Sequence, residues 1–212
     1  MIDPATFGAF VFTAVIIVIS PGPDTMLLLR YTMNGGRRIG LATVAGIQLG
    51  MVAHTVLAVA GLSLIIAKSP LLFKLIAVGG ALYLAYLAIQ ALRAGMLRIR
   101  GDAAPLRISG WRAMRDAFVT NMLNPKVILL FIALFPNFVD PRRDDVWMQL
   151  IVLGAVLIAI NFMWLIPLAA FAGLMRRWLG TAAVQRGVNW ATFSVFMSFA
   201  VLMVLEHVFH VF

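Results

Sequence analysis

The chain has 212 residues, of which 63% are hydrophobic and only 12% are charged, and its mean hydropathy is +1.00. A soluble domain of this size cannot hide so much apolar surface, so the composition excludes an ordinary water-soluble protein. The 17 basic residues outnumber the 8 acidic ones and give a formal charge of +9, and there is no cysteine. Disulfide frameworks and thiolate metal sites are therefore excluded.

Apolar runs long enough to cross a bilayer occupy most of the chain. A membrane-spanning helix needs about 20 largely apolar residues, and six segments reach that length. They lie at about residues 5–29, 39–66, 71–92, 113–138, 146–175 and 189–211. Irregular backbone is not stable in lipid, and the runs lack the alternation of barrel strands. The sequence therefore predicts an all-α membrane protein in which residues 1–212 form a single transmembrane domain.

Charged residues beside prolines interrupt two of these runs. The first run contains Ser20-Pro21-Gly22-Pro23-Asp24, and the fourth contains Asn124-Pro125-Lys126. One Asp or Lys at mid-bilayer costs roughly 2.5 to 3.5 kcal/mol, so an ionisable residue there is a functional-site hypothesis by default. Each proline also removes an amide hydrogen and frees a carbonyl group one turn earlier. The sequence predicts that the first and fourth helices are broken at these prolines.

The residues at each break indicate where a new helical piece begins. Asp24 is expected to cap a piece that starts at Thr25, and Asn124 to cap one that starts at Pro125. A cation in the first turn opposes the helix dipole, so local stability does not favour Lys126. It needs an anionic partner, for which Asp24 and a substrate carboxylate are the two candidates. A buried ion pair that only locks the helices together is the alternative interpretation.

The two breaks also indicate an internal duplication. A shift of 102 residues aligns Pro23 with Pro125 and Asp24 with Lys126, each before an apolar run. With three helices in each half, the second half must cross the membrane in the opposite direction. We therefore expect two inverted three-helix repeats, joined by a cytoplasmic loop. The repeats and the loop lie at about residues 5–92, 113–211 and 93–112.

The basic residues predict the orientation of the chain, because short loops rich in Lys and Arg stay in the cytoplasm. Twelve of them lie around the connections that follow the first, third and fifth segments, against four in the other connections. Both termini are therefore expected on the periplasmic side. Contact of the basic loops with anionic lipid headgroups also explains the positive charge without a nucleic-acid partner.

The second predicted helix carries Gly46, Gly50 and His54 at intervals of four, which places them on one face. Small residues at this spacing allow another helix to approach closely, so the glycines are interpreted as packing residues. His54 has two interpretations. It can carry protons, because its titration range spans physiological pH, or it can be a hydrogen-bonded structural residue.

Other polar features give weaker signals. Asn161, Trp164 and Pro167 make the fifth segment the next polar element, where a packing kink is preferred over a ligand contact. An intramembrane hydrolase needs a nucleophile with a base, or a pair of aspartates, and Asp24 is the only carboxylate expected at mid-membrane. The sequence therefore predicts neither an enzyme nor a metal or cofactor site.

Several motifs follow one another in a fixed order over about residues 5–140. They are Ser20-Pro21-Gly22-Pro23-Asp24, Gly46-Ile47-Gln48-Leu49-Gly50, Gly80-Ala81-Leu82-Tyr83-Leu84 and Phe118-Val119-Thr120-Asn121-Met122-Leu123-Asn124-Pro125-Lys126. In type, order and spacing they resemble the LysE/RhtB family of amino-acid exporters. The resemblance implies a carrier of the bacterial inner membrane that exports amino acids or close derivatives and is driven by the proton gradient.

The predicted substrate site takes its residues from both breaks. It comprises Ser20, Pro21, Gly22, Pro23, Asp24, Asn121, Asn124, Pro125 and Lys126. We expect a zwitterion whose carboxylate lies near Lys126 and whose ammonium group lies near Asp24. Proton competition for Asp24 would couple export to the gradient, and His54 is the second candidate for that role.

A cation or metal exporter of similar helical plan is the alternative function. One Asp, one Lys and no Cys suit a zwitterion better than a divalent ion, which prefers several oxygen or sulfur ligands. The expected partners are thus an amino-acid substrate and the bilayer, while the sequence leaves a homo-oligomer open.

Overall fold

The computed structural model describes residues 2–20, 22–62, 70–93, 108–141, 143–172, 174 and 181–209. Every regular element in these residues is helical, which confirms the predicted all-α class. Two helical stretches are long and apolar enough to cross a membrane, Arg37–Gly61 and Val146–Ala170, and the bent pair Pro4–Ile19 with Pro23–Gly35 adds a third. The expected number of six spans stays a prediction.

The first two helices form one bent element. Helix α1 spans Pro4–Ile19 and is capped by Asp3, whose carboxylate accepts hydrogen bonds from two backbone amides of the first turn. Helix α2 spans Pro23–Gly35 and lies at 50° to α1. Gly36 has a φ of +80°, which glycine adopts without strain, and it turns the chain directly into α3 at Arg37–Leu57.

The first half ends with two further elements. Helix α3 continues into a wider π-helical turn, η1, at Ala58–Leu62. Helix α5 spans Pro70–Arg93 and differs by one residue at each end from the predicted run at 71–92. Most of the expected cytoplasmic loop, from residue 94 to residue 107, lies outside the described residues.

The second half begins with a broken helix. Helix α6 spans Gly110–Met122 and α7 spans Pro125–Leu129. A π-helical turn, η2 at Leu130–Leu134, and a 3₁₀ turn, η3 at Phe135–Phe138, extend α7 to the end of the predicted run. The chain is thus non-helical only at residues 123 and 124 between α6 and α7.

The last two helices differ from the predicted bounds. Helix α8 spans Val146–Ala170, five residues shorter than expected, and α10 spans Ala182–Phe209. The expected start of the last helix at residue 189 is therefore wrong by seven residues. The prediction followed hydrophobicity alone, whereas Ala, Gln and Arg favour a helix although they need not lie in lipid. Arg186 folds back onto its own helix and donates a hydrogen bond to the carbonyl of Ala182.

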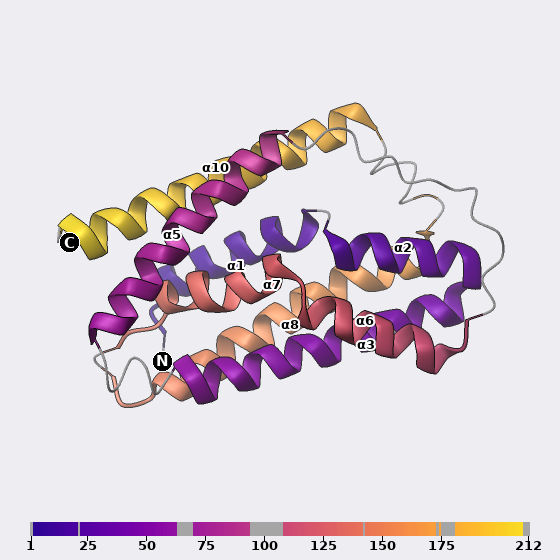
Figure 1. Ribbon diagram of the computed structural model, residues 1–212, viewed down its shortest axis with the longest axis horizontal. Helices are drawn as coiled ribbons and strands as arrows, with labels where there is room; N and C mark the ends of the chain where they lie inside the picture. The colour runs from indigo at the N-terminus through magenta and orange to yellow at the C-terminus, as the bar shows by residue number, and fades with distance from the viewer. Residues whose placement is uncertain are drawn as a thin grey trace.

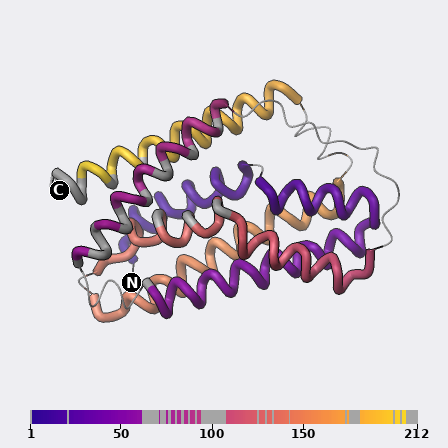
Figure 2. The backbone as a smooth tube through the Cα atoms, viewed as in Figure 1, coloured from indigo at the N-terminus to yellow at the C-terminus, as the bar shows by residue number. Residues whose placement is uncertain are grey.

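The helices pack side by side in a few extensive pairs. Helix α3 packs along α6 and also against α8, while α5 packs along α10. The α5 and α10 pair lies across one side of the bundle (Figures 1 and 2). Figure 1 also shows that α1 begins and α10 ends at the same end of the molecule.

Two apolar clusters fill the bundle. In the larger cluster, the ring of Phe10 meets Phe135 and Phe138 edge-on, with centroids 5.7 and 5.2 Å apart. The smaller cluster is built around Leu28 and Ile47, which are both fully buried. The α1–α2 and α6–α7 junctions lie in the middle of the bundle (Figure 1). The fold therefore brings the residues around Asp24 and those around Lys126 together in the middle of the bundle.

Candidate functional site

Asp24 is the second residue of α2 and is only 9% exposed. Its Oδ2 atom accepts hydrogen bonds from the side-chain amides of Asn121 at 2.8 Å and Asn124 at 2.9 Å. Its other oxygen, Oδ1, is buried and has no hydrogen-bond partner among the described residues. Asp24, at the first break, is thus hydrogen-bonded directly to two residues at the second break, which lie 97 and 100 positions later in the sequence.

The capping role expected for Asp24 is wrong. Helix α2 begins at Pro23 rather than Thr25, and its N-cap residue is Gly22, which has no side chain to bind the first turn. Proline is well suited to the first helical position because it lacks the amide that would otherwise be unpaired. The carboxylate of Asp24 is therefore left to bind across the bundle. Pro21 lies outside the described residues.

The second break positions Lys126. Asn124 caps α7 by accepting a hydrogen bond from the backbone amide of Lys126 at 3.1 Å, and Pro125 is the first helical residue, as predicted. The ammonium group of Lys126 donates a hydrogen bond to the backbone carbonyl of Ser20. That carbonyl follows the last turn of α1, where the helix dipole is negative. Lys126 is therefore paired with the backbone carbonyl group at the end of α1.

Asp24 and Lys126 line one cavity with a volume of about 40 Å³. Thr25, Asn124 and Asn161 add polar lining, while most of the other lining side chains are aliphatic. The space can hold water, because roughly 10–15 Å³ of such volume takes one molecule.

Helix α3 contacts Asn121, which is one of the two asparagines that bind Asp24. The Nε2 atom of His54 lies 3.3 Å from the backbone carbonyl of Asn121, and its ring stacks on Phe131 with centroids 5.4 Å apart. These contacts favour the structural interpretation of His54. A Cβ atom on Gly50 would overlap the side-chain oxygen of Asn121, and one on Gly46 would overlap the backbone of α6. The glycines are therefore where α6 approaches α3 closely.

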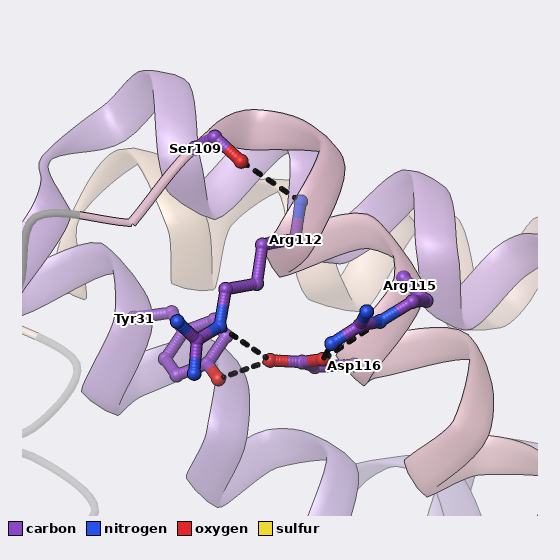
Figure 3. A network of polar contacts seen from close by, with 5 residues as sticks. All are labelled: Tyr31, Ser109, Arg112, Arg115 and Asp116. Atoms are coloured by element: carbon purple, nitrogen blue, oxygen red, sulfur yellow. Dashed lines mark hydrogen bonds and ion pairs between the residues drawn. The ribbon is translucent and has the colours of Figure 1, made fainter.

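A second polar cluster joins the two halves near the α2–α3 turn (Figure 3). The hydroxyl group of Tyr31 donates a hydrogen bond to Oδ2 of Asp116 at 3.0 Å. The guanidinium groups of Arg112 and Arg115 approach the same carboxylate to 3.7 and 2.9 Å. Sequence reasoning missed this cluster because Tyr31 and Asp116 are 85 residues apart. The local signal is the spacing of four between Arg112 and Asp116, which is typical of a helical ion pair.

Apolar helices around a buried, charged cavity define a multi-pass helical membrane protein. The family model described as LysE type translocator matches residues 15–207, so the chain belongs to the LysE family. Members of this family are transporters and not enzymes. The resemblance inferred from the motifs is thereby confirmed.

Several relatives match along most of their length. An uncharacterized membrane protein of Vibrio cholerae is 33% identical over 92% of this chain and 94% of its own. A homoserine/homoserine lactone efflux protein of Salmonella typhimurium is 30% identical, over 89% and 91%. A leucine efflux protein of Salmonella choleraesuis is 28% identical, over 82% of both chains. No solved structure matches the chain.

Proposed function

We propose that this protein is a secondary transporter of the bacterial inner membrane that exports amino acids or close derivatives. The observation that carries the proposal is the cavity lined by Asp24 and Lys126, two opposite charges contributed by the two breaks. The names of two relatives, which describe homoserine and leucine efflux, support the same substrate class.

The cavity suits a zwitterion. The Oδ1 atom of Asp24 has no hydrogen-bond partner among the described residues and is the acceptor for the substrate ammonium group. Lys126 has three donors, of which one binds the Ser20 carbonyl, and it is the partner for the substrate carboxylate. Asn121 and Asn124 hold Asp24 in place through its other oxygen. Charge is thus matched at both ends of the amino-acid backbone.

The proposed architecture is six spans in two inverted repeats, with both termini in the periplasm. Its support is the packing of α3 on α8 and of α5 on α10, since each pair joins the helices that hold the same place in the two halves. The start of α1 and the end of α10 also lie at one end of the bundle (Figure 1). The basic residues at the opposite end would then meet anionic headgroups in the cytoplasmic leaflet.

Proton coupling is proposed to act through Asp24. A proton bound to its carboxylate from the periplasmic side removes the charge that holds the ammonium group, so the substrate is released outward. Loss of the proton to the cytoplasm restores the charge. His54 is the second candidate for this role and becomes the first if Asp24 proves not to couple.

Export of a divalent cation is the alternative with a similar helical plan. Lys126 argues against it, because its ammonium group would stand beside the ion with Asp24 as the one carboxylate in the described lining. A divalent metal prefers several oxygen or nitrogen ligands without a neighbouring cation.

Counterflow into vesicles reconstituted with the purified protein tests the proposal. The vesicles are loaded with one amino acid, and uptake of the radiolabelled form is compared across the common amino acids, Mg²⁺, Mn²⁺ and Zn²⁺. We expect accumulation of at least one amino acid above the level of protein-free vesicles. Counterflow of a metal ion in the absence of any amino-acid signal would overturn the proposal.

A further inference from the structure

Side-chain hydrogen bonds join helices α2 and α6 at two points in the described residues. In the middle of the bundle, Asp24 accepts a hydrogen bond from Asn121 at 2.8 Å. About two turns further along α2, Tyr31 donates one to Asp116 at 3.0 Å. The earlier residue of α2 meets the later residue of α6, so the two helices run in opposite directions. The strip of helix contact between these two bonds is the α2–α6 seam.

Apolar packing fills the seam between its two ends. Leu28 stands on the same face of α2 as Asp24 and Tyr31, four residues after one and three before the other. Its side chain is fully buried and belongs to the apolar cluster that also contains Ala117 of α6. Packed hydrocarbon therefore separates Tyr31 from the cavity at Asp24.

The Tyr31 end of the seam lies where the packed interior meets water. Tyr31 itself is buried, whereas the side chain of Asp116 is 25% exposed, and Arg112 and Arg115 beside it are mostly exposed (Figure 3). Short segments rich in arginine stay in the cytoplasm, so this end is the one expected to face it. A hydrogen bond at such a rim is exchanged for bonds to water at a small net cost. It therefore suits a contact that opens and closes.

We propose that the hydrogen bond between Tyr31 and Asp116 is the latch of a cytoplasmic gate, and that the α2–α6 seam parts when a substrate passes from the cytoplasm to the cavity at Asp24. The inference rests on the proposed function, because it assigns this gate to a carrier with that orientation. It gives a role in transport to two residues that are not among the described lining residues of the cavity.

Thiol labelling tests the gate, because the chain has no cysteine and each introduced thiol is unique. Leu28→Cys places a thiol in the seam, and its rate of reaction with a membrane-impermeant maleimide follows the population of the open form. The maleimide is added to the cytoplasmic or the periplasmic face of membrane vesicles. We expect Leu28→Cys to react faster from the cytoplasmic face. Tyr31→Phe keeps the ring and removes only the bond, so it should raise this rate roughly fivefold.

Matched variants separate the latch from its surroundings. Asn34→Ala removes a hydrogen bond of the same helix end that stays within α2, and it should leave the rate unchanged. Asp116→Asn keeps an acceptor for the tyrosine hydroxyl group, so it should raise the rate less than Asp116→Ala does. Ala14→Cys places a second reporter at a fully buried position of α1, in the other apolar cluster, where Tyr31→Phe should have no effect.

An unchanged labelling rate of Leu28→Cys in the presence of Tyr31→Phe would overturn the inference. An equal increase at Ala14→Cys would do so as well, because it would mean that the whole fold has loosened. Faster labelling from the periplasmic face would place the seam on the wrong side for the proposed gate. Labelling needs no substrate, so a latch that responds as expected in a protein without counterflow of any amino acid would overturn the proposed function and not the opening of the seam.

Discussion

The hydroxyl group of Tyr31 on α2 and the carboxylate of Asp116 on α6 form a hydrogen bond of 3.0 Å that connects the first half of the chain to the second. Arg112 and Arg115, on the same helix as Asp116, contact the carboxylate as well. Near the α2–α3 turn, this contact adds a polar connection to the helix packing (Figure 3).

We expect this hydrogen bond to stabilise the folded protein measurably. Tyr31→Phe and Asp116→Ala should each lower the free energy of unfolding in detergent, and a double-mutant cycle should give a coupling of about 1 kcal/mol, as for a partly buried hydrogen bond. Thermal or denaturant unfolding of the four proteins measures it. Strictly additive effects of the two changes would show that the contact contributes nothing.

Asp24→Asn should abolish export driven by a proton gradient. The variant keeps the shape of the side chain and an oxygen for Asn121 and Asn124, so the protein should fold and insert, but it has no charge for a proton to neutralise. Efflux from vesicles at a series of pH values is the measurement, and Asp144→Asn, at an exposed position, is the matched control. If Asp24→Asn exports with an unchanged pH dependence, Asp24 is not the coupling residue, and His54 should be tested next.

Lys126→Ala should remove the preference for a free carboxylate on the substrate. The ammonium group of Lys126 is the proposed partner of that carboxylate, so amino-acid methyl esters should compete with the parent amino acids only in the variant. Competition in the counterflow assay measures this preference. The Ser20 carbonyl also loses its donor in the variant, and folding is therefore checked separately by thermal unfolding. An unchanged discrimination against the esters would remove Lys126 from the substrate site.

Gly50→Ala should impair both folding and transport. Its new methyl group would overlap the side-chain oxygen of Asn121, which would have to move away from Asp24. Overpacking of this kind typically destabilises by about 1–3 kcal/mol. Gly8→Ala is the matched control, because a Cβ at Gly8 in α1 meets nothing within 4 Å and alanine favours a helix. Equal stability of the two variants would mean that α6 can yield at this position.

Reporter fusions test the topology. A fusion at residue 103 should report the cytoplasm and one at the C-terminus the periplasm, because three spans separate them in the predicted arrangement. Activity of both reporters on the same side would exclude the inverted arrangement. The proposed cavity and its charges would not be affected by that result.

Sequence reasoning located the helices where composition changes sharply and missed features that depend on partners. Pro23 and the pair Asn124-Pro125 indicated where α2 and α7 begin, because proline and a capping asparagine act on their own backbone. The start of α10 was misplaced because polarity marks a membrane boundary and not the end of a helix. The contact of Tyr31 with Asp116 and the position of Asn161 in the cavity depend on which helix faces which, and no local pattern contains that information.

The face of α3 that carries Gly46 and Gly50 lies so close to α6 that not even a methyl group fits between the two helices. One turn away on the same face lie Ala42 and His54, and a slide of α3 by one turn, about 5.4 Å along the axis, would bring one of these side chains to a position where a Cβ overlaps α6. Two helices in such contact can rotate with the rest of the bundle but cannot shear past each other. In the proposed transport cycle we therefore expect α3 and α6 to move together as one rigid body, with the relative motion at their borders with α2 and α8.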